Sequence, residues 1–538
     1  MLVSILALVT FSLACAVYRR WRRISISDVP GPECKSFLYG NLPEFLGGQA
    51  GDMRFLFDVV YTDFEWRDKY GDVFKIRGPL GAIQYIYHTA SYRFPKAEGR
   101  RQISHLLFGP GLSNVDGDVH KRQRKDMLPG FGGPESKAFS PDVLSVCREG
   151  LIGYLDSGGA THLSADQSIV LDVTSWISRA TLDAIAAFDY SFGALDDSDN
   201  QLTKAYANLF SFDIFGIPTE AAILSLSVMD HLPPAMVAFL MRNFPGRLSH
   251  GLLTNKLSTA IAKDLGKGRR DIMSLLVEAN ASENAKTRLP PRELFAQMNT
   301  IILAGHETTS NTLCFGLLEF CKHPEIQQKL RREIHAAERA IRNNGRTEST
   351  ASDLDSMPYL SAVVKETLRY HAVVYNVFRV SSQDDVLPLN NPITTTSGKV
   401  LHELPIPKGL QIISSVAAYN RVCLWRHAEN KEIFGDDADV FNPERWLRES
   451  VPKTTASLGV YGSLFTFAGG ARSCIGWRFA VLEMHMFLIQ LVGNFEFSLA
   501  EDKDIRREAT FVMTPKTEGE IEKGSLLRLK IKVAQKEE

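Results

Sequence analysis

A cysteine near the C-terminus lies in a segment suited to present a thiolate. The segment reads Phe467-Ala-Gly-Gly-Ala-Arg-Ser-Cys-Ile-Gly476 and precedes an apolar helical run at 477–492. Cys474 stands at the expected helix start, where free backbone N–H groups and the helix dipole stabilise negative charge on sulfur. Arg472 can reach an anionic group beside it. Three glycines let the backbone approach a flat partner closely: Gly469, Gly470 and Gly476.

This segment resembles the haem-binding signature of the cytochromes P450, Phe-x-x-Gly-x-Arg-x-Cys-x-Gly, at every fixed position. The resemblance implies that Cys474 is the thiolate ligand of the iron of haem b, a ligand that favours O–O cleavage. It also implies that Arg472 meets a haem propionate and that Phe467 packs near the sulfur. Gly470 and Gly476 are expected to lie against the same cofactor.

A second segment, Ala304-Gly-His-Glu-Thr-Thr309, lies in the middle of a predicted long helix. It resembles the family's (Ala/Gly)-Gly-x-(Asp/Glu)-Thr-Thr. Ala304 and Gly305 are expected beside the cofactor, with Gly305 leaving room for dioxygen. The Thr308 hydroxyl is expected to bond back to the carbonyl of Ala304. Together with Glu307 it offers a route for protons to the dioxygen being reduced, so these two residues are the catalytic candidates.

Two further segments resemble conserved parts of the same family. Glu366-Thr-Leu-Arg369 matches its Glu-x-x-Arg helix, and Phe441-Asn-Pro-Glu-Arg-Trp446 matches its Pro-Glu-Arg-Trp segment. The resemblance implies that Glu366, Arg369 and Arg445 form a buried charge network with a structural role. Without that context, Glu366 and Arg369 would be an ordinary ion pair on a solvated helix face.

Further propionate-binding candidates follow from the resemblance. Arg379 lies where family members place a propionate-binding arginine. The run from His120 to Arg124 resembles the family's Trp-x-x-x-Arg, with Arg124 as the propionate partner and His120 in place of the tryptophan. The neighbouring cations belong either to a solvated helix face or to a docking surface for a reductase: Lys121, Arg122 and Lys125.

The elements that must position these residues are mainly helical. Apolar residues recur at three- and four-residue spacing over 291–322, after Pro290-Pro291 and before His323-Pro324, which predicts one helix of that length. Strand-like segments are expected at 375–381, 409–415 and 526–533. We therefore predict a mostly α fold with minor β structure, the cytochrome P450 fold, as a single domain over 37–538.

Composition excludes several other classes of protein. The net charge is −1, with 61 basic and 62 acidic residues, so no global basic field points to nucleic acid. Seven cysteines in 538 residues, with no Cys-x-x-Cys pair, do not suit a disulfide-rich secreted scaffold or a zinc site.

The N-terminus is predicted to cross a membrane. Leu2 to Tyr18 carries no formal charge and is followed by Arg19-Arg20-Trp21-Arg22-Arg23. As a helix of 1.5 Å rise this run spans about 25 Å. Basic residues after the run place the remaining chain in the cytosol. We expect a signal anchor at 1–23, a proline-rich hinge at 24–36, and a single-pass protein of the endoplasmic reticulum membrane; a cleaved signal peptide is the alternative.

The expected activity is that of a haem-thiolate monooxygenase acting on a lipophilic small molecule such as a terpenoid or other secondary-metabolite intermediate. Its substrate-facing walls are expected at 101–117, 210–215, before Ala304 and at 375–378. Electrons would come from an NADPH-dependent cytochrome P450 reductase, with cytochrome b5 as a second candidate donor, because no dinucleotide-binding Gly-x-Gly-x-x-Gly motif follows a strand. The alternatives are a fatty-acid or xenobiotic hydroxylase, a haem-thiolate isomerase or dehydratase, and a haem sensor without turnover.

Overall fold

The computed structural model describes the chain in separate stretches. These are residues 84–138, 168–186, 288–347, 349–421, 437–448, 458–509 and 512–535, with short pieces at 28–29, 75–76, 78–79, 143, 146, 236, 277, 280–281 and 434. The predicted anchor at 1–23 lies outside them, as does nearly all of the hinge at 24–36. Within these stretches, no helix combines the length and the apolar character that a membrane span requires.

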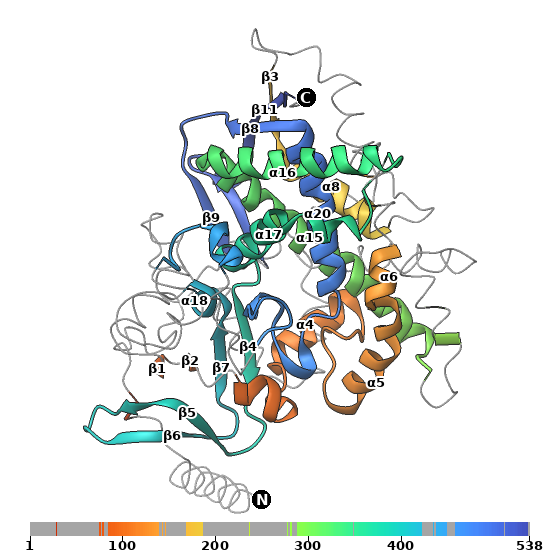
Figure 1. Cartoon of the computed structure of the whole chain (residues 1–538). Coiled ribbons are helices and arrows are strands. Elements are labelled where there is room, and N and C mark those ends of the chain that lie inside the picture. The colour runs from red at the N-terminus through yellow and green to blue at the C-terminus, as the bar shows by residue number, and fades with distance from the viewer. Residues whose placement is uncertain are drawn as a thin grey trace, which may run out of the picture.

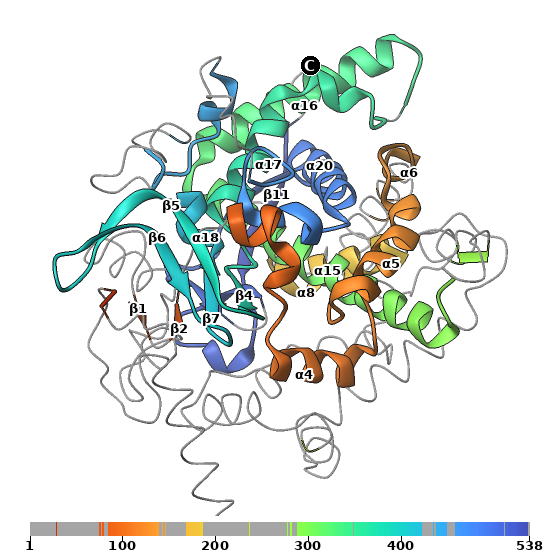
Figure 2. The same ribbon diagram turned by 90° about the horizontal axis from the view of Figure 1, so that it is seen from below.

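The long helix α15 (Pro291–Lys322) passes through the middle of the molecule (Figures 1 and 2). Its bounds are those predicted from the sequence. Pro291 occupies the first turn, where a missing N–H costs nothing, and Pro324 cannot continue the helix. Most of its second half is buried, from Thr309 to Phe320. The helix α15 therefore serves as the central axis on which the neighbouring elements pack.

Helices surround α15 on several sides. The helices α8 (Val173–Ala186), α16 (Pro324–Asn343), α17 (Pro358–Tyr370) and α20 (Trp477–Asn494) all pack against it. Shorter helices lie around the cysteine segment and farther out: α4 (Glu98–Phe108), α5 (Gly117–Met127), α6 (Gly133–Ala138) and α18 (Val416–Arg421). The predicted helix after Cys474 is confirmed as α20, which continues two residues beyond the expected end.

The three predicted strands are present. They are β4 (Asn376–Val380), which pairs antiparallel with β7 (Gln411–Ser415), and β11 (Arg528–Val533), which lies between β3 (Ser168–Asp172) and β8 (Phe495–Leu499). Two further hairpins were not predicted from the sequence. One joins β5 (Asp385–Thr394) to β6 (Val400–Ile406), and the other joins β9 (Ile505–Ala509) to β10 (Met513–Thr517). The tiny strands β1 (Lys75–Ile76) and β2 (Gly78–Pro79) also pair.

The described part of the core has two apolar clusters. The larger one is formed by α8, α15, α16, α17 and α20. The smaller one lies between the segment at 85–94 and the strands β5, β6 and β7. The mostly α class with minor β structure is therefore confirmed. The cysteine segment lies where the two clusters meet, because Phe465 belongs to the smaller cluster and Phe467 packs against the larger one.

Candidate functional site

The cysteine segment folds as a tight loop that ends at the start of α20. Two short 3-10 turns, Phe465–Phe467 and Gly470–Arg472, precede Cys474. The backbone N–H of Cys474 donates to the carbonyl of Phe467 over 2.8 Å, which closes the loop. The side chain of Cys474 is exposed, although Arg472 and Ser473 before it are buried. The loop thus holds its backbone inside the protein and presents the sulfur.

The glycines of this loop serve contacts within the protein. Gly470 has φ +63°, and a Cβ there would overlap the carbonyl oxygen of Tyr87. A Cβ on Gly469 would overlap the carbonyl oxygen of Leu458, whereas one on Gly476 would make an ordinary contact with Phe131 at 3.7 Å. The expectation that glycines of this loop let a flat partner approach is therefore corrected for Gly469 and Gly470. At Gly469 and Gly470 the close approach is between two protein segments.

The surroundings of the Cys474 thiol have opposing effects on its pKa. The protein atoms packed around it raise the pKa, while the backbone N–H of Gly476 and the positive charge of Arg124 lower it; the net change is upward. The helix start was predicted to stabilise the thiolate, and it does not outweigh desolvation. A haem iron bound to this sulfur would hold it as the thiolate, because a metal ion deprotonates a coordinating thiol.

Cationic side chains gather beside the loop around one carboxylate. Asp116, at the start of α5, forms an ion pair with Arg472 and accepts the backbone N–H of Lys96 over 3.2 Å. The ammonium of Lys96 donates to the carbonyl of Leu112 over 3.1 Å, and burial lowers its pKa to about 7. Arg472 keeps Nε and Nη2 buried without a hydrogen-bond partner. The cluster is rich in positive charge and retains unused donors.

The other propionate candidates lie in the same region. Arg124 donates to the carbonyl of Ser473 over 2.7 Å and to its hydroxyl over 3.1 Å. Arg379 is buried above the ring of Tyr87, 5.1 Å from its centroid. His120 is buried and its Nδ1 lies 3.0 Å from the hydroxyl of Tyr92; burial and the nearby cations lower its pKa to about 3. His120 is therefore neutral at physiological pH.

The catalytic candidates lie side by side along α15. The Thr308 hydroxyl donates to the carbonyl of Ala304 over 2.8 Å, as predicted. Ala304 is exposed although it lies in the middle of the central helix, so this face of α15 borders an open space. The Glu307 carboxylate accepts from the side-chain amide of Asn311 over 3.1 Å and lies 3.3 Å from Nε2 of His306.

Gly305 has a different role from the one expected. A Cβ at this position would come within 2.7 Å of Cδ1 of Ile185 on α8. The missing side chain therefore faces a neighbouring helix, and it allows α15 and α8 to pack closely. The expectation that Gly305 makes room for dioxygen is corrected: within α15, it is Ala304 that borders the open space.

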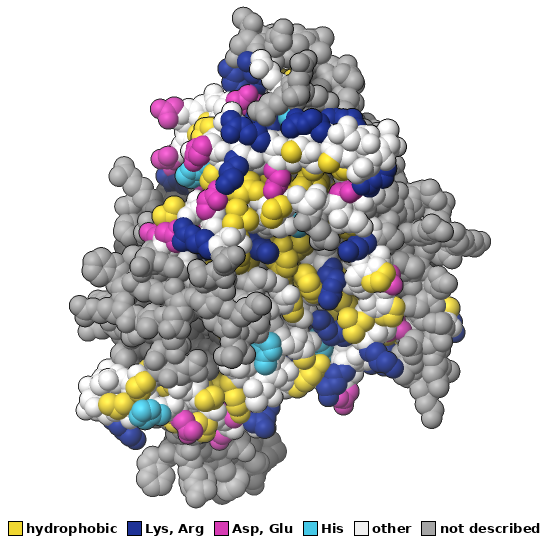
Figure 3. Space-filling view, viewed as in Figure 1, with side chains coloured by type: hydrophobic (Ala, Val, Ile, Leu, Met, Phe, Trp, Pro, Cys, Tyr) yellow, Lys and Arg dark blue, Asp and Glu magenta, His cyan; other side chains and the backbone are white. Residues whose placement is uncertain are grey.

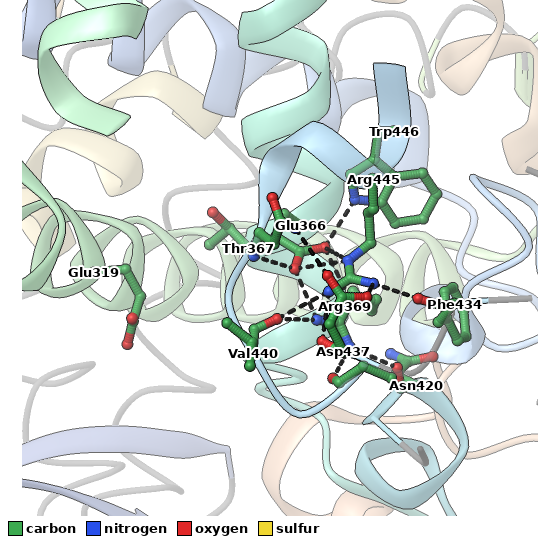
Figure 4. A network of polar contacts seen from close by, with 12 residues as sticks. Glu319, Glu366, Thr367, Arg369, Asn420, Phe434, Asp437, Val440, Arg445 and Trp446 are labelled. Atoms are coloured by element: carbon green, nitrogen blue, oxygen red, sulfur yellow. Dashed lines mark hydrogen bonds and ion pairs between the residues drawn. The ribbon is translucent and has the colours of Figure 1, made fainter. Parts of the chain in front are cut away.

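The predicted charge network is present and buried (Figure 4). Glu366 and Arg369 have fully buried side chains, and Glu366 accepts two bonds from Arg369, at 2.7 and 2.9 Å. It also accepts from Nε of Arg445 over 3.1 Å and from the indole N–H of Trp446 over 2.8 Å. Asp437 accepts from Arg445 over 2.8 Å, so two carboxylates balance two guanidinium groups. The solvated-face interpretation is therefore excluded.

This network connects directly to the cysteine loop. Arg369 donates to the carbonyl of Asn420 over 3.1 Å. The side chain of Asn420 in turn accepts the backbone N–H of Phe465 over 3.0 Å and donates to the hydroxyl of Thr466 over 2.7 Å. The hydroxyl of Thr466 in turn donates to the carbonyl of Leu368, the residue before Arg369, over 2.8 Å. The first turn of the loop is thus fixed to the network residues.

Comparison with known proteins agrees with this geometry. Residues 60–522 match the model of the family described as Cytochrome P450. The chain belongs to the cytochrome P450 family. It is similar to cytochrome P450 monooxygenase 91 of Postia placenta, with 32% identity over 92% of this chain and 94% of the relative. It is also 32% identical to ganoderic acid synthetase of Ganoderma lucidum, over 92% of this chain and 93% of the relative. Its identity to cytochrome P450 monooxygenase claW of Ampulloclitocybe clavipes is 30%, over 90% of this chain and 88% of the relative.

Membership makes this P450 a haem-thiolate monooxygenase, and its residues fit the cofactor. Four basic side chains lie near His120, and Asp116 forms an ion pair with one of them, Arg472; the basic residues are Lys96, Arg124, Arg379 and Arg472. This concentration of positive charge suits the two haem propionates. The two unpaired nitrogens of Arg472 are donors available to such an anion. The presented sulfur of Cys474 could serve as the thiolate ligand of the haem iron, and this role stays a prediction. The individual propionate roles of Arg124, Arg379, Arg472 and His120 stay predictions.

Sequence reasoning missed several residues of this site. Asp116 and Lys96 belong to no motif, and the ion-pair partner of Asp116, Arg472, lies 356 positions away. Asn311 could have been found, because it lies one helical turn after Glu307. Trp446 is part of the Pro-Glu-Arg-Trp segment, but no role was predicted for it, and its indole N–H donates to Glu366. Arg122 was assigned either to a solvated helix face or to a docking surface, whereas it forms an ion pair with Glu293 of α15 at 2.9 Å.

The network yields a stability prediction. Arg369→Ala leaves the Glu366 carboxylate buried without its main partner, which costs about 3 to 5 kcal/mol. We expect a strong loss of haem incorporation, measured as the ratio of Soret to protein absorbance in the purified protein, together with a lower midpoint of thermal unfolding. Lys121→Ala, which breaks an exposed pair of the same i,i+3 spacing with Asp118, is the matched control and should change neither quantity. Normal haem content in Arg369→Ala would contradict the structural role.

Proposed function

We propose that this P450 inserts one oxygen atom from O2 into a lipophilic small molecule, such as a terpenoid or another secondary-metabolite intermediate. We propose further that the protein is anchored in the membrane of the endoplasmic reticulum and receives electrons from an NADPH-dependent reductase, with cytochrome b5 as a second donor. The observation that carries the monooxygenase assignment is the acid–alcohol pair of Glu307 and Thr308 on the open face of α15.

The haem supplies oxygen activation when bound, and the chain's own residues manage protons and access. The Thr308 proton points to the carbonyl of Ala304, so the lone pairs of its hydroxyl remain available to accept a proton. Glu307 is held in place by Asn311. This arrangement favours a reaction that consumes protons. An isomerase or dehydratase needs no such supply, and a sensor needs no turnover.

Two observations support a lipophilic substrate. Ala304 on the central helix α15 and Val374, in the connection between α17 and β4, are exposed apolar residues. The Ganoderma relative is named for the synthesis of a ganoderic acid, which favours a related class of molecule. A fatty-acid or xenobiotic hydroxylase shares the lipophilic surroundings and is separated from this proposal by which compounds bind. The predicted wall at 210–215 lies outside the described residues.

Membrane attachment is proposed from the sequence. The uncharged run from Leu2 to Tyr18, followed by four arginines within five residues, is typical of a signal anchor with its catalytic part in the cytosol. A lipophilic substrate and a membrane-bound reductase would both be accessible from that position. Fractionation of cells that express the chain with and without residues 1–23 tests the proposal. We expect the protein in the membrane fraction only when residues 1–23 are present.

The docking surface for a reductase is proposed at the α5 basic patch, which we define as Lys121, Lys125, Lys137 and Arg478. All four side chains are exposed. Figure 3 has basic side chains gathered over α5, α6 and the start of α20. Arg124 on the same helix contacts Ser473, so the patch borders the cysteine loop. Arg122 does not belong to it, because Glu293 is its partner.

Thr308→Ala tests the monooxygenase assignment. The variant should retain haem and the thiolate spectrum, because the one bond that the hydroxyl makes within the described residues is to the carbonyl of Ala304 on its own helix. Without it, reduction of oxygen to water and product should fall by about 10²-fold, and the NADPH consumed should appear as hydrogen peroxide. Thr312→Ala is the matched control, since its hydroxyl makes the same 2.8 Å bond to the carbonyl of Thr308 while buried. Unchanged peroxide release in Thr308→Ala would point to a reaction without oxygen activation.

Charge reversal tests the docking surface. Lys121→Glu with Lys125→Glu should slow reductase-supported reduction by about 2- to 10-fold at low salt, with a smaller effect at high salt, because screening removes the attraction. The control is Lys532→Glu on β11, at the other end of the molecule in Figure 1. Stopped-flow reduction rates measure both. Equal rates for the double variant and the control would contradict this docking site.

A further inference from the structure

The first residues that the structure describes are bound to the tip of the β5–β6 hairpin. The backbone carbonyl of Asp28 accepts the backbone N–H of Thr396 over 2.8 Å, and its carboxylate accepts the Thr396 hydroxyl over 2.5 Å. The same carboxylate accepts the backbone N–H of Ser397 over 3.0 Å and also the Ser397 hydroxyl. Asp28 is thereby joined to a turn that follows it by more than two thirds of the chain.

The tip itself is a closed turn at 395–399. The backbone N–H of Thr395 donates to the carbonyl of Lys399 over 2.8 Å, and that of Gly398 donates to the carbonyl of Thr395 over 2.9 Å. Gly398 has φ +83°, a conformation that glycine adopts without strain. The hydroxyl of Thr395 accepts the backbone N–H of Lys399 over 3.0 Å. A segment bound to this turn is therefore fixed relative to both strands of the hairpin.

The next residue adds an apolar contact. Val29 is only 5% exposed and belongs to the smaller apolar cluster, together with Leu404 and Ile406 of β6. Hydrogen bonds from the tip, those of the Ser397 hydroxyl first, lower the pKa of Asp28 to about 2, so its carboxylate is charged at neutral pH. The segment at 28–29 is thus held by hydrogen bonds to a carboxylate and by the burial of an apolar side chain.

This contact lies close in sequence to the predicted membrane anchor. Arg23, the last residue of the basic flank, stands five positions before Asp28. Five residues of fully extended chain span at most about 18 Å. Whatever path the chain takes between them, the tip of the β5–β6 hairpin must lie within that distance of the basic flank.

The side chains of the tip suit a phospholipid surface. Lys399 is exposed, and Val400 after it is 52% exposed. A lysine beside an exposed apolar residue matches the boundary between lipid headgroups and acyl chains. Two valines of the β3–β11–β8 sheet, at the opposite end of the molecule in Figure 1, are just as exposed: Val170 at 51% and Val533 at 69%. Exposure alone does not distinguish the two ends, whereas the contact with Asp28 does.

We propose that the contact between Asp28 and the β5–β6 hairpin holds the hairpin tip, residues 395–400, against the cytosolic surface of the membrane. This orientation rests on the proposed anchor at 1–23 and adds to it which end of the catalytic domain meets lipid. The partner is a phospholipid surface that contains anionic headgroups, which attract Lys399 and the arginines of the basic flank. An anchor on an unattached linker would leave the domain free to turn.

The full-length haem protein in vesicles of phosphatidylcholine and phosphatidylserine tests this surface. A genetically encoded fluorescent amino acid takes the place of Val400 in one sample and of Val533, the matched control, in another. Lipids that carry a quencher near the headgroup should remove most of the fluorescence at position 400 and little of that at position 533. Equal quenching at the two positions would overturn the proposal.

Asp28→Ala separates the hairpin contact from the anchor. The variant keeps residues 1–23, so it should still float with the vesicles, while quenching at position 400 should fall toward that at position 533. Ser397→Ala removes one of the hydroxyls on the tip side and should act in the same direction, which covers the case that Asp28→Ala fails to fold. Asp384→Ala is the matched control, because that carboxylate accepts the backbone N–H of Lys408 over 2.7 Å at the other end of the hairpin. Quenching at position 400 should remain there as in the wild type.

Failure of the anchor and failure of the hairpin contact give different results. If the full-length protein does not float with the vesicles, the anchor proposal is wrong and this orientation falls with it. If the protein floats but position 400 stays unquenched, or if the quenching survives Asp28→Ala, the anchor stands and the proposed orientation is wrong.

Discussion

The carboxylate of Glu366 is the contact on which the geometry of the site depends. It is fully buried and satisfied by two arginines, a backbone N–H and an indole N–H. A buried charge with this many partners tolerates little displacement, because each lost bond leaves a polar group without solvent. Through Arg369 and Asn420 the same network reaches Phe465 and Thr466, where the cysteine loop begins. The position of the sulfur is thus set by charges that take no part in the chemistry.

A second constraint comes from α15. The helix must pack tightly against α8, which Gly305 permits, and must also present an open face with Ala304 and Thr308. Polar groups inside a helix of this kind satisfy one another along the same helix, as with Thr308 and Ala304, Asn311 and Glu307, or Thr312 and Thr308. Proton handling is therefore built from short-range contacts on one rigid element. The cofactor side is instead assembled from distant segments.

That difference explains how far the sequence could predict the site. The bond between Thr308 and Ala304, the Glu366–Arg369 pair and the bounds of α15 all depend on residues within one turn or on flanking prolines. The ion pair between Asp116 and Arg472 joins residues 356 positions apart, so no local sequence pattern could predict it. The β5–β6 hairpin was missed because proline and asparagine interrupt its alternation. The role of Gly305 could not be predicted without knowing that Ile185 lies opposite.

We propose that the loop fixed by this network presents Cys474 as the thiolate ligand of haem iron. The most direct measurement is the reduced-minus-CO difference spectrum of the wild-type protein beside Cys474→Ser, at matched protein concentration. We expect a thiolate-type Soret band in the wild type and its loss in the variant. The same thiolate band in both proteins, or its absence from a wild-type protein that holds haem, would contradict it.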